Sequence, residues 1–437
     1  MNVLRAHLCY HVPGLVAHIG GCNLPSILHW IPVSVAFGLF GAVLAKSLVT
    51  GLLFVNRLLV GSVGSFAAPA LGASLAVLLI WRVSRRASGF GTDQYIKSLS
   101  DPSQRIDLRL SATKLGATCL TVGSGGSGGL VGPTLLIGAG LAQLLALIRR
   151  LMPQLSNILD PRTAHMVGAA SMLGALLGAP LAAAVLVVEV PYRTSIEYRA
   201  LLPALVGSTS GALFHTMLWG TYARPPGTLL PAPTAQHVYW AALAALLGVL
   251  AGLSLLLCLR ACQRYAARFD TPLLAVAGAL LVGLLAYALG TEILGWGMQE
   301  SFNSWSHDTP LSSRGIWLGF AKSVATALTA GTGASGGLVG PAVAIGALIG
   351  NGVAVQAGIP LVVTCISAMA ACLSTVSNVP LAASLLMLEV FGLGAWMYAV
   401  PGSVLGFVCA RQWVAYDVIA LRRIEAERRA NKSPAAQ

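Results

Sequence analysis

Long apolar runs, separated by short polar or glycine- and proline-rich breaks, dominate this sequence. A helix that crosses a membrane needs about 20 apolar residues, and many of the runs approach that length. In the first half they predict helices over residues 31–59, 66–81, 108 to a glycine-rich stretch at 123, 133–148, 163–190 in two segments, and 199–218. In the second half they predict helices over residues 237–260, 272–290, 316–330, 360–376, 380–391 and 395–410, and a final helix that carries Tyr416. A short polar helix should follow Gly89 and end near Leu99.

The composition places this pattern in a membrane. Of 437 residues, 56% are hydrophobic and only 9% are charged, with mean hydropathy +0.78, whereas soluble domains carry about a quarter charged residues. The net charge is +13, but the basic residues gather in short loops and at the C-terminus, as cytoplasmic segments do beside anionic lipid. We therefore expect an all-α integral membrane protein whose partner is the lipid bilayer and that binds no nucleic acid. The eight cysteines form no Cys-x-x-Cys pair, so we expect neither a metal site nor a disulfide framework.

One glycine-rich phrase occurs twice, once in each half of the chain. Residues 123–133 read Gly-Ser-Gly-Gly-Ser-Gly-Gly-Leu-Val-Gly-Pro, and residues 331–341 match them at nine of eleven positions. The match extends outward without a gap, because Lys114 and Lys322 each stand seventeen residues before the valine of their phrase. A duplicated apolar segment, interrupted by glycine and proline at matching places, is typical of membrane transporters built from repeats.

The phrase has the chemistry of an anion site. Glycines let the backbone bend and expose its N–H groups, and proline suits the first turn of a helix. The unpaired N–H groups at a helix start carry about half a positive charge, so an anion is the natural occupant. Inside a membrane, such a broken helix must be buried in protein or line a wet cavity. A pair of small-residue helix contacts is the plainer interpretation, but it explains two matched copies poorly.

A second duplicated block supports a division into two repeats. Residues 180–190 match residues 380–390 and place Glu189 and Glu389 at equivalent positions. Carboxylates in such apolar surroundings are costly, and both a structural and a conducting role remain open for them. Prolines cluster between the halves and stop helices there. We predict a first membrane repeat at 1–221, a proline-rich linker at 222–236, and a second membrane repeat at 237–437 with a short basic C-terminal tail.

Taken together, these residues resemble the CLC family of chloride channels and chloride/proton exchangers over nearly the whole chain. Residues 129–133, Gly-Leu-Val-Gly-Pro, stand where the family has Gly-Arg/Lys-Glu-Gly-Pro, and residues 337–341 stand where it has Gly-Ile/Tyr-Phe-Ala/Val-Pro. The stretch from Ala179 to Glu189 resembles the family's Asn-Ala-Pro-Leu-Ala-Gly segment, and Tyr416 matches its pore tyrosine. Only about 20 residues follow Tyr416, so the resemblance is to prokaryotic members, and we expect no CBS domains.

The resemblance implies an inverted-repeat fold with broken, tilted helices, assembled as a homodimer with an anion pathway in each subunit. The anion-binding and pore residues that it implies are Phe90, Gly91, Leu130, Val131, Leu338, Val339 and Tyr416. Backbone N–H groups would be the main donors, and the Tyr416 hydroxyl group would add another. Lys114 matches the family's buried lysine and would raise the local potential. The plainer interpretations are an interfacial aromatic residue for Tyr416 and a snorkelling side chain for Lys114.

Several positions depart from the family pattern. Val131 stands at the position of the gating glutamate. Gapless spacing puts Phe90 where the family has its central anion-binding serine, and Ser88, two residues earlier, replaces that serine only if the loop is rearranged. Asp93 stands in place of a proline and is a candidate helix cap.

The remaining departure concerns proton transfer. Val190 falls at the position of the exchangers' internal proton-relay glutamate, and Glu189 precedes it directly, so a one-residue shift could disguise the relay. Because both carboxylates of the proton path are missing, we predict passive, proton-uncoupled conduction of chloride or other small anions. The alternative is an anion/proton antiporter that uses a non-standard carboxylate such as Glu189. We expect no enzyme activity, no cofactor besides the transported chloride, no metal, and a multi-pass location in the cell membrane, of the bacterial inner-membrane type.

Two remote alternatives belong to other classes. Ser335, in Gly-Ala-Ser-Gly, and His18 resemble the serine and histidine segments of rhomboid intramembrane proteases, in which a Ser–His pair supplies nucleophile and base. Their order along this chain is the reverse of the rhomboid order. A non-conducting structural descendant of the family is the other alternative, and Phe90 is the residue best placed to block its pathway.

Overall fold

A computed structural model describes residues 24–145, 160–193, 195–222, 230–269, 272–297, 314–413 and 415–416. Within these ranges the regular elements are helices, joined by one isolated bridge between two glycines. Five of the helices are long and apolar enough to cross a membrane. Large apolar side chains such as Phe54, Leu273 and Trp317 are exposed on the outer surface, which suits contact with lipid. The expected all-α membrane fold is therefore confirmed.

The first half of the chain begins with the long helix α3 (Leu24–Val83), which is bent at Gly64. The bend separates the two helices that the apolar pattern predicts, because Gly64 takes a non-helical conformation with φ of 77°. The elements that follow are η1 (Arg85–Ala87), α4 (Thr92–Ser100), η2 (Pro102–Gln104), α5 (Leu108–Gly123), α6 (Val131–Ala139), α8 (Pro161–Leu177), α9 (Pro180–Glu189) and α10 (Tyr198–Trp219).

Helix α6 differs from its prediction at both ends. It begins at Val131 rather than at Pro133, since proline is tolerated in the first turn, where its missing N–H would have no acceptor. It ends at Ala139, but after a turn at residues 140–141 the chain is helical again over 142–145, and residues 146–159 lie outside the described ranges. The start of α6 therefore presents the N–H groups of Val131 and its neighbours.

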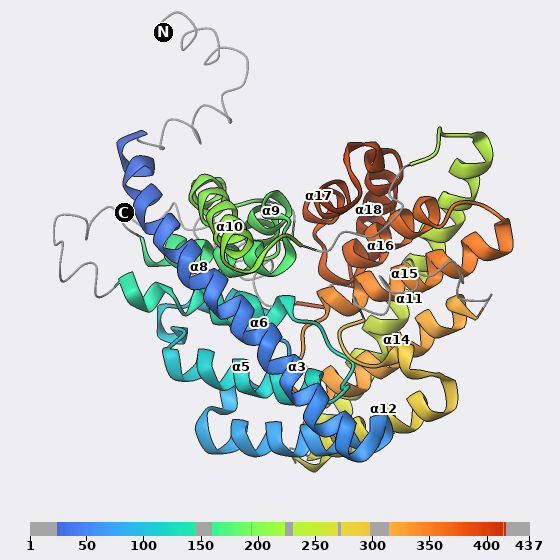
Figure 1. The fold of residues 1–437 in the computed structure, drawn as a ribbon, viewed down its shortest axis with the longest axis horizontal. Helices are drawn as coiled ribbons and strands as arrows, with labels where there is room; N and C mark the ends of the chain where they lie inside the picture. The colour runs from blue at the N-terminus through green and yellow to red at the C-terminus, as the bar shows by residue number, and fades with distance from the viewer. Residues whose placement is uncertain are drawn as a thin grey trace, which may run out of the picture.

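The second half repeats this arrangement. Its elements are α11 (Ala235–Phe269), α12 (Leu273–Leu289), η4 (Thr291–Ile293), α14 (Gly315–Gly331), α15 (Val339–Ala357), α16 (Leu361–Ser377), α17 (Pro380–Phe391), η5 (Leu393–Ala395) and α18 (Trp396–Ala410). Figure 1 shows the two halves facing each other, with α9 and α17 adjacent near the middle. A final helix was predicted to carry Tyr416, but Tyr416 is not helical, and the residues after it, including the basic tail, lie outside the described ranges. Linker residues 223–229 also lie outside them, so the repeat boundaries stay a proposal.

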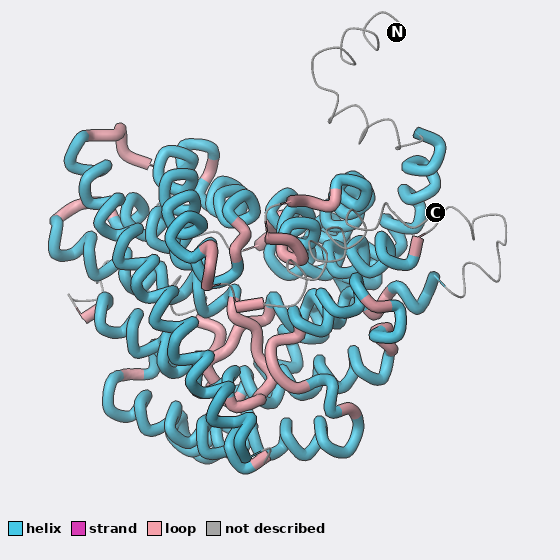
Figure 2. The backbone as a smooth tube through the Cα atoms, turned by 180° about the vertical axis from the view of Figure 1, so that it is seen from behind, coloured by secondary structure: helices cyan, strands magenta, loops and turns pink. Residues whose placement is uncertain are grey.

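Two short loops make equivalent hydrogen bonds in the two halves. Residues 89–91 read Gly-Phe-Gly and follow η1, and residues 295–297 read Gly-Trp-Gly and follow η4. The Gly89 N–H group donates to the Gly333 carbonyl at 3.4 Å, and its counterpart on Gly295 donates to the Gly125 carbonyl at 3.1 Å. Each loop thus pairs with the glycine phrase of the other half. Figure 2 shows loops gathered among the helices at the centre of the molecule.

Candidate functional site

The two glycine phrases meet as an antiparallel pair. The Gly129 N–H group donates to the Gly337 carbonyl, and the Gly337 N–H group donates to the Gly129 carbonyl, each at 2.7 Å. Helices α6 and α15 begin two residues later, at Val131 and Val339. Within the described ranges, the amide groups of residues 130–132 and 338–340 have no hydrogen-bond acceptor. Two positive helix ends therefore converge at the centre of the protein, as an anion requires.

Side chains would not fit where the phrases cross. A Cβ atom on Gly129 would lie 2.6 Å from Cδ of Pro341, and one on Gly337 would lie 2.7 Å from the Gly132 nitrogen. Both distances are shorter than real Cβ contacts, so the crossing requires glycine. The repeated Gly-Leu-Val-Gly-Pro pattern is therefore explained by the close approach of two backbones.

A buried lysine holds the Gly-x-Gly loop in each half. Lys114 is fully buried, and its Nζ atom donates to the carbonyl groups of Ala87 at 3.0 Å and Gly89 at 2.5 Å. Lys322 is also fully buried, and its Nζ atom donates to carbonyl groups of residues 292–295 at 3.0 to 3.5 Å. A snorkelling side chain would reach the surface, so that interpretation is wrong for both lysines. Each ammonium group fixes a central loop, and its charge lies inside the protein.

Most residues of the predicted pathway belong to the large hydrophobic cluster that forms the main core, and each of these is 7% exposed or less. They are Phe90, Val131, Leu338, Val339 and Tyr416. Gly91 directly precedes α4, with φ of 84°, and an added Cβ there would lie 2.8 Å from the Gly132 carbonyl oxygen. Leu130 instead packs in a separate cluster with residues of α3. The Leu130 side chain thus packs apart from the other predicted residues.

Phe90 and Tyr416 pack against each other in this cluster. Their ring centroids are 6.3 Å apart and their planes are inclined by 75°, an edge-to-face arrangement that aromatic rings favour. Tyr416 is buried, so the interfacial interpretation of this residue is wrong. The Phe90 phenyl ring occupies space beside the tyrosine where the family pattern implies a serine.

Two hydroxyl groups that sequence reasoning missed lie beside Tyr416. Thr92, the first residue of α4, and Ser377, the last residue of α16, both interact with the Tyr416 hydroxyl group. All three residues are buried. The Thr92 hydroxyl also faces the start of α6, since it lies 2.9 Å from the place of a Cβ on Gly132. Ser88 could replace the family's serine only if the loop were rearranged, and the hydroxyl that interacts with the tyrosine belongs to Thr92.

Asp93 brings a carboxylate close to the same region. It lies in the first turn of α4, where it complements the helix dipole. The N-cap position itself is held by Gly91 rather than by Asp93. Asp93 interacts electrostatically with both Lys114 and Tyr416. The Asp93 carboxylate therefore places negative charge near the converging first turns of the helices.

The comparison with known families agrees with this geometry. The family profile described as voltage-gated chloride channel matches residues 72–411. This chain belongs to the CLC family. A chloride/fluoride channel protein of Pseudomonas syringae pv. tomato is 28% identical over 332 residues, which cover 73% of this chain and 71% of that protein. CLC proteins are membrane transporters and channels for anions.

Solved CLC structures share the fold. A CLC-type fluoride/proton antiporter superposes with a TM-score of 0.78 at 22% identity, over 91% of this chain and 99% of that chain. A slow cyanobacterial chloride/proton antiporter superposes with a TM-score of 0.73 at 20% identity, over 94% and 100% of the two chains. The inverted-repeat CLC fold expected from the duplicated phrases is confirmed.

The duplicated glutamates cap helices of the opposite CLC repeat. The Glu189 carboxylate accepts the N–H groups of Leu381 and Ala382 at 3.1 and 2.8 Å, at the start of α17. The Glu389 carboxylate accepts the corresponding N–H groups at the start of α9, residues 181–182, at 2.9 and 2.7 Å. Each oxygen of each carboxylate thus has a backbone donor. This geometry gives both glutamates a structural role between the repeats.

Ser335 takes part in another symmetric pair. Its hydroxyl group lies 2.9 Å from that of Thr118, and Ser127 lies 3.0 Å from Thr326 at the equivalent place. Ser335 is fully buried, and His18 lies outside the described ranges. A buried serine that matches its repeat partner is a fold contact, which counts against a protease nucleophile.

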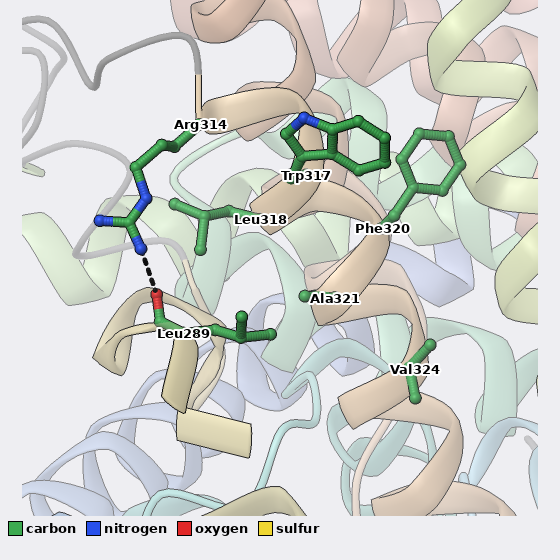
Figure 3. Close-up of a pocket in the computed structure, with 7 residues that line it drawn as sticks. All are labelled: Leu289, Arg314, Trp317, Leu318, Phe320, Ala321 and Val324. Carbon is green, nitrogen blue, oxygen red and sulfur yellow. Dashed lines mark hydrogen bonds between the residues drawn. The ribbon is translucent and has the colours of Figure 1, made fainter. Parts of the chain in front are cut away.

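A pocket of about 370 Å³ lies away from this site, between α12 and α14. Figure 3 shows its lining, with the Arg314 guanidinium group donating to the Leu289 carbonyl. The other lining residues are apolar, namely Trp317, Leu318, Phe320, Ala321 and Val324. None of the predicted pathway residues borders this pocket.

Proposed function

We propose that this CLC protein conducts chloride or another small anion passively, without coupling to protons, through one pathway in each subunit of a homodimer in the cell membrane. Val131 carries the proposal, because a buried aliphatic side chain begins α6 at the position of the gating glutamate. A valine has no titratable group, and it cannot compete with an anion for N–H donors. The pathway therefore lacks the side chain that links anion and proton movement in the family's exchangers.

Among the described residues, the two carboxylates nearest in sequence to Val190 already have partners. Val190 is apolar and 5% exposed, and the neighbouring Glu189 is engaged by two backbone N–H groups. Glu197 lies nearby in the chain, but it forms an ion pair with Arg162 at 3.2 Å and accepts a hydrogen bond from Tyr192 at 2.5 Å. These partners favour structural roles for both glutamates, so Glu189 is a poor candidate for the proton relay.

Coupled anion/proton exchange is the second candidate function. The position of the Asp93 carboxylate favours it. Its carboxylate interacts electrostatically with Lys114 and Tyr416. It is therefore better placed than Glu189 to change its protonation when an anion binds. The resemblance to two proton antiporters concerns the fold and leaves this choice open. An Asp93→Asn variant separates the candidates, because passive conduction does not need a titratable group there.

Anion efflux from liposomes tests the proposal. Vesicles loaded with potassium chloride and containing the purified protein should release chloride when valinomycin makes the membrane permeable to potassium. Protein-free vesicles are the control. No efflux from the wild-type protein, with efflux restored by Phe90→Ala, would instead support the structural descendant in which Phe90 blocks the pathway.

A further inference from the structure

The pocket between α12 and α14 has an apolar wall and one cationic end (Figure 3). Its wall along α14 is built by residues three or four positions apart, a spacing that places them on one face of the helix. They are Arg314, Trp317, Leu318, Ala321 and Val324. From Arg314 to Val324 the helix rises about 15 Å, which matches the hydrocarbon depth of about 15 Å in one leaflet of a bilayer. The pocket therefore extends from a charged group along an apolar face over the depth of a leaflet.

The rim of this pocket suits contact with lipid. The Trp317 side chain is 76% exposed, and those of Leu289 and Val324 are each 38% exposed. Tryptophan is enriched where lipid headgroups meet the hydrocarbon region, and an arginine side chain lays its apolar stem along the protein while its charged end reaches that boundary. Trp317 and Arg314 together therefore indicate that the cationic end of the pocket lies at headgroup depth.

The same end favours an anion. Arg314 holds the N-cap position of α14, and its guanidinium group donates to the Leu289 carbonyl at 3.3 Å. A guanidinium group has five N–H donors and recognises phosphate well, and the start of α14 adds the positive end of a helix dipole. Among the described residues that line the pocket, none is acidic. Charge and shape together suit a phosphate group that carries an apolar tail.

We propose that this pocket binds an anionic phospholipid, with its phosphate group at Arg314 and one acyl chain along Trp317, Ala321 and Val324. The site is separate from the proposed anion pathway, whose predicted residues do not border it. A second copy of the chain is a poorer occupant. A two-fold interface on this face would bring two Arg314 side chains and two positive helix starts together, and like charges at an interface are unfavourable.

Quenching of Trp317 fluorescence by brominated acyl chains tests the proposal in liposomes that contain the full chain. Brominated phosphatidylglycerol or brominated phosphatidylcholine is mixed in rising fractions with unbrominated phosphatidylcholine. Because Trp317 is one of nine tryptophans, the signal of a Trp317→Phe variant is subtracted to isolate it. Phosphatidylglycerol should reach half-maximal quenching at about one tenth of the mole fraction that phosphatidylcholine needs, as expected for charge-assisted hydrogen bonds to the anionic headgroup.

Variants of the pocket locate the effect. Arg314→Gln should remove the preference, so that both lipids quench alike, whereas Arg314→Lys keeps the charge and should retain part of it. Ala321→Leu narrows the apolar wall and should reduce quenching by both lipids. Arg268→Gln is the matched control, because it removes an exposed positive charge in the last turn of α11 that does not line the pocket. It should leave the preference unchanged.

The wild-type comparison needs no variant, so the test stands even if Arg314→Gln fails to fold. Equal half-maximal fractions for the two lipids in the wild-type protein would overturn the proposal, and so would an undiminished preference in folded Arg314→Gln protein. Absence of quenching by either lipid would also overturn it, and would show that another part of the chain or a second copy covers the pocket.

Discussion

Replacing Glu189 by alanine separates a structural carboxylate from a proton relay. The variant removes two hydrogen bonds, at 3.1 and 2.8 Å, and leaves the first N–H groups of α17 without an acceptor. A hydrogen bond to a charged group contributes about 1.5–3 kcal/mol. Loss of both bonds should therefore destabilise the protein by about 3–6 kcal/mol.

The effect should appear as a lower melting temperature in detergent. For large domains, 1 kcal/mol corresponds to about 2 °C, so Glu189→Ala should melt about 6–12 °C below the wild-type protein. Glu189→Gln keeps one acceptor oxygen and should give a smaller loss. Size-exclusion chromatography after heating, with melting followed by tryptophan fluorescence, measures both variants.

Glu389→Ala is the matched variant. Its carboxylate makes the equivalent bonds to α9 at 2.9 and 2.7 Å, so it should lower the melting temperature by a similar amount. Anion efflux by folded Glu189→Gln protein should be unchanged. The structural explanation is refuted if Glu189→Ala melts like the wild-type protein and alters proton movement in liposomes.

Three further predictions concern single residues. Val131→Glu should introduce a side chain that plugs the pathway near neutral pH and leaves it on protonation, so chloride efflux should become strongly pH-dependent; efflux that is high and constant from pH 4 to 8 would contradict this. Lys114→Met should reduce conductance or anion affinity, because a unit charge roughly 10 Å away is worth about 1.7 kcal/mol at an effective dielectric of about 20 before screening. Unchanged single-channel conductance and affinity in folded protein would refute that electrostatic role. Ser335 should resist a fluorophosphonate probe because it is fully buried and bonded to Thr118, and covalent labelling there would revive the protease hypothesis.

The repeat architecture could be predicted because each repeat carries a copy of the same short sequence. Two copies of one phrase, each ending in Gly-Leu-Val-Gly-Pro, require backbone crossings, and the structure pairs them at Gly129 and Gly337. The Gly-x-Gly loops were missed as a repeat because they lie 206 residues apart rather than 208. A two-residue difference in loop length hides such a match from a gapless comparison.

The hydroxyl groups beside Tyr416 could not be predicted, because they come from elements that are far apart in the sequence. Thr92 and Ser377 belong to different repeats, and nothing in their local sequence marks them as neighbours of Tyr416. Gapless spacing pointed to Phe90, whose ring the structure places against that tyrosine. Likewise, the duplicated block showed that Glu189 and Glu389 are equivalent, but only the packing of α9 on α17 shows that each caps the other's helix.

Proton movement driven by chloride tests the uncoupled mechanism most directly. Liposomes containing the purified protein are given a chloride gradient at matched internal and external pH, with the membrane potential clamped by potassium and valinomycin. We predict chloride movement with no accompanying uphill proton movement. Proton movement against its gradient, at a fixed ratio to chloride and abolished by Asp93→Asn, would contradict passive conduction and identify the carboxylate responsible.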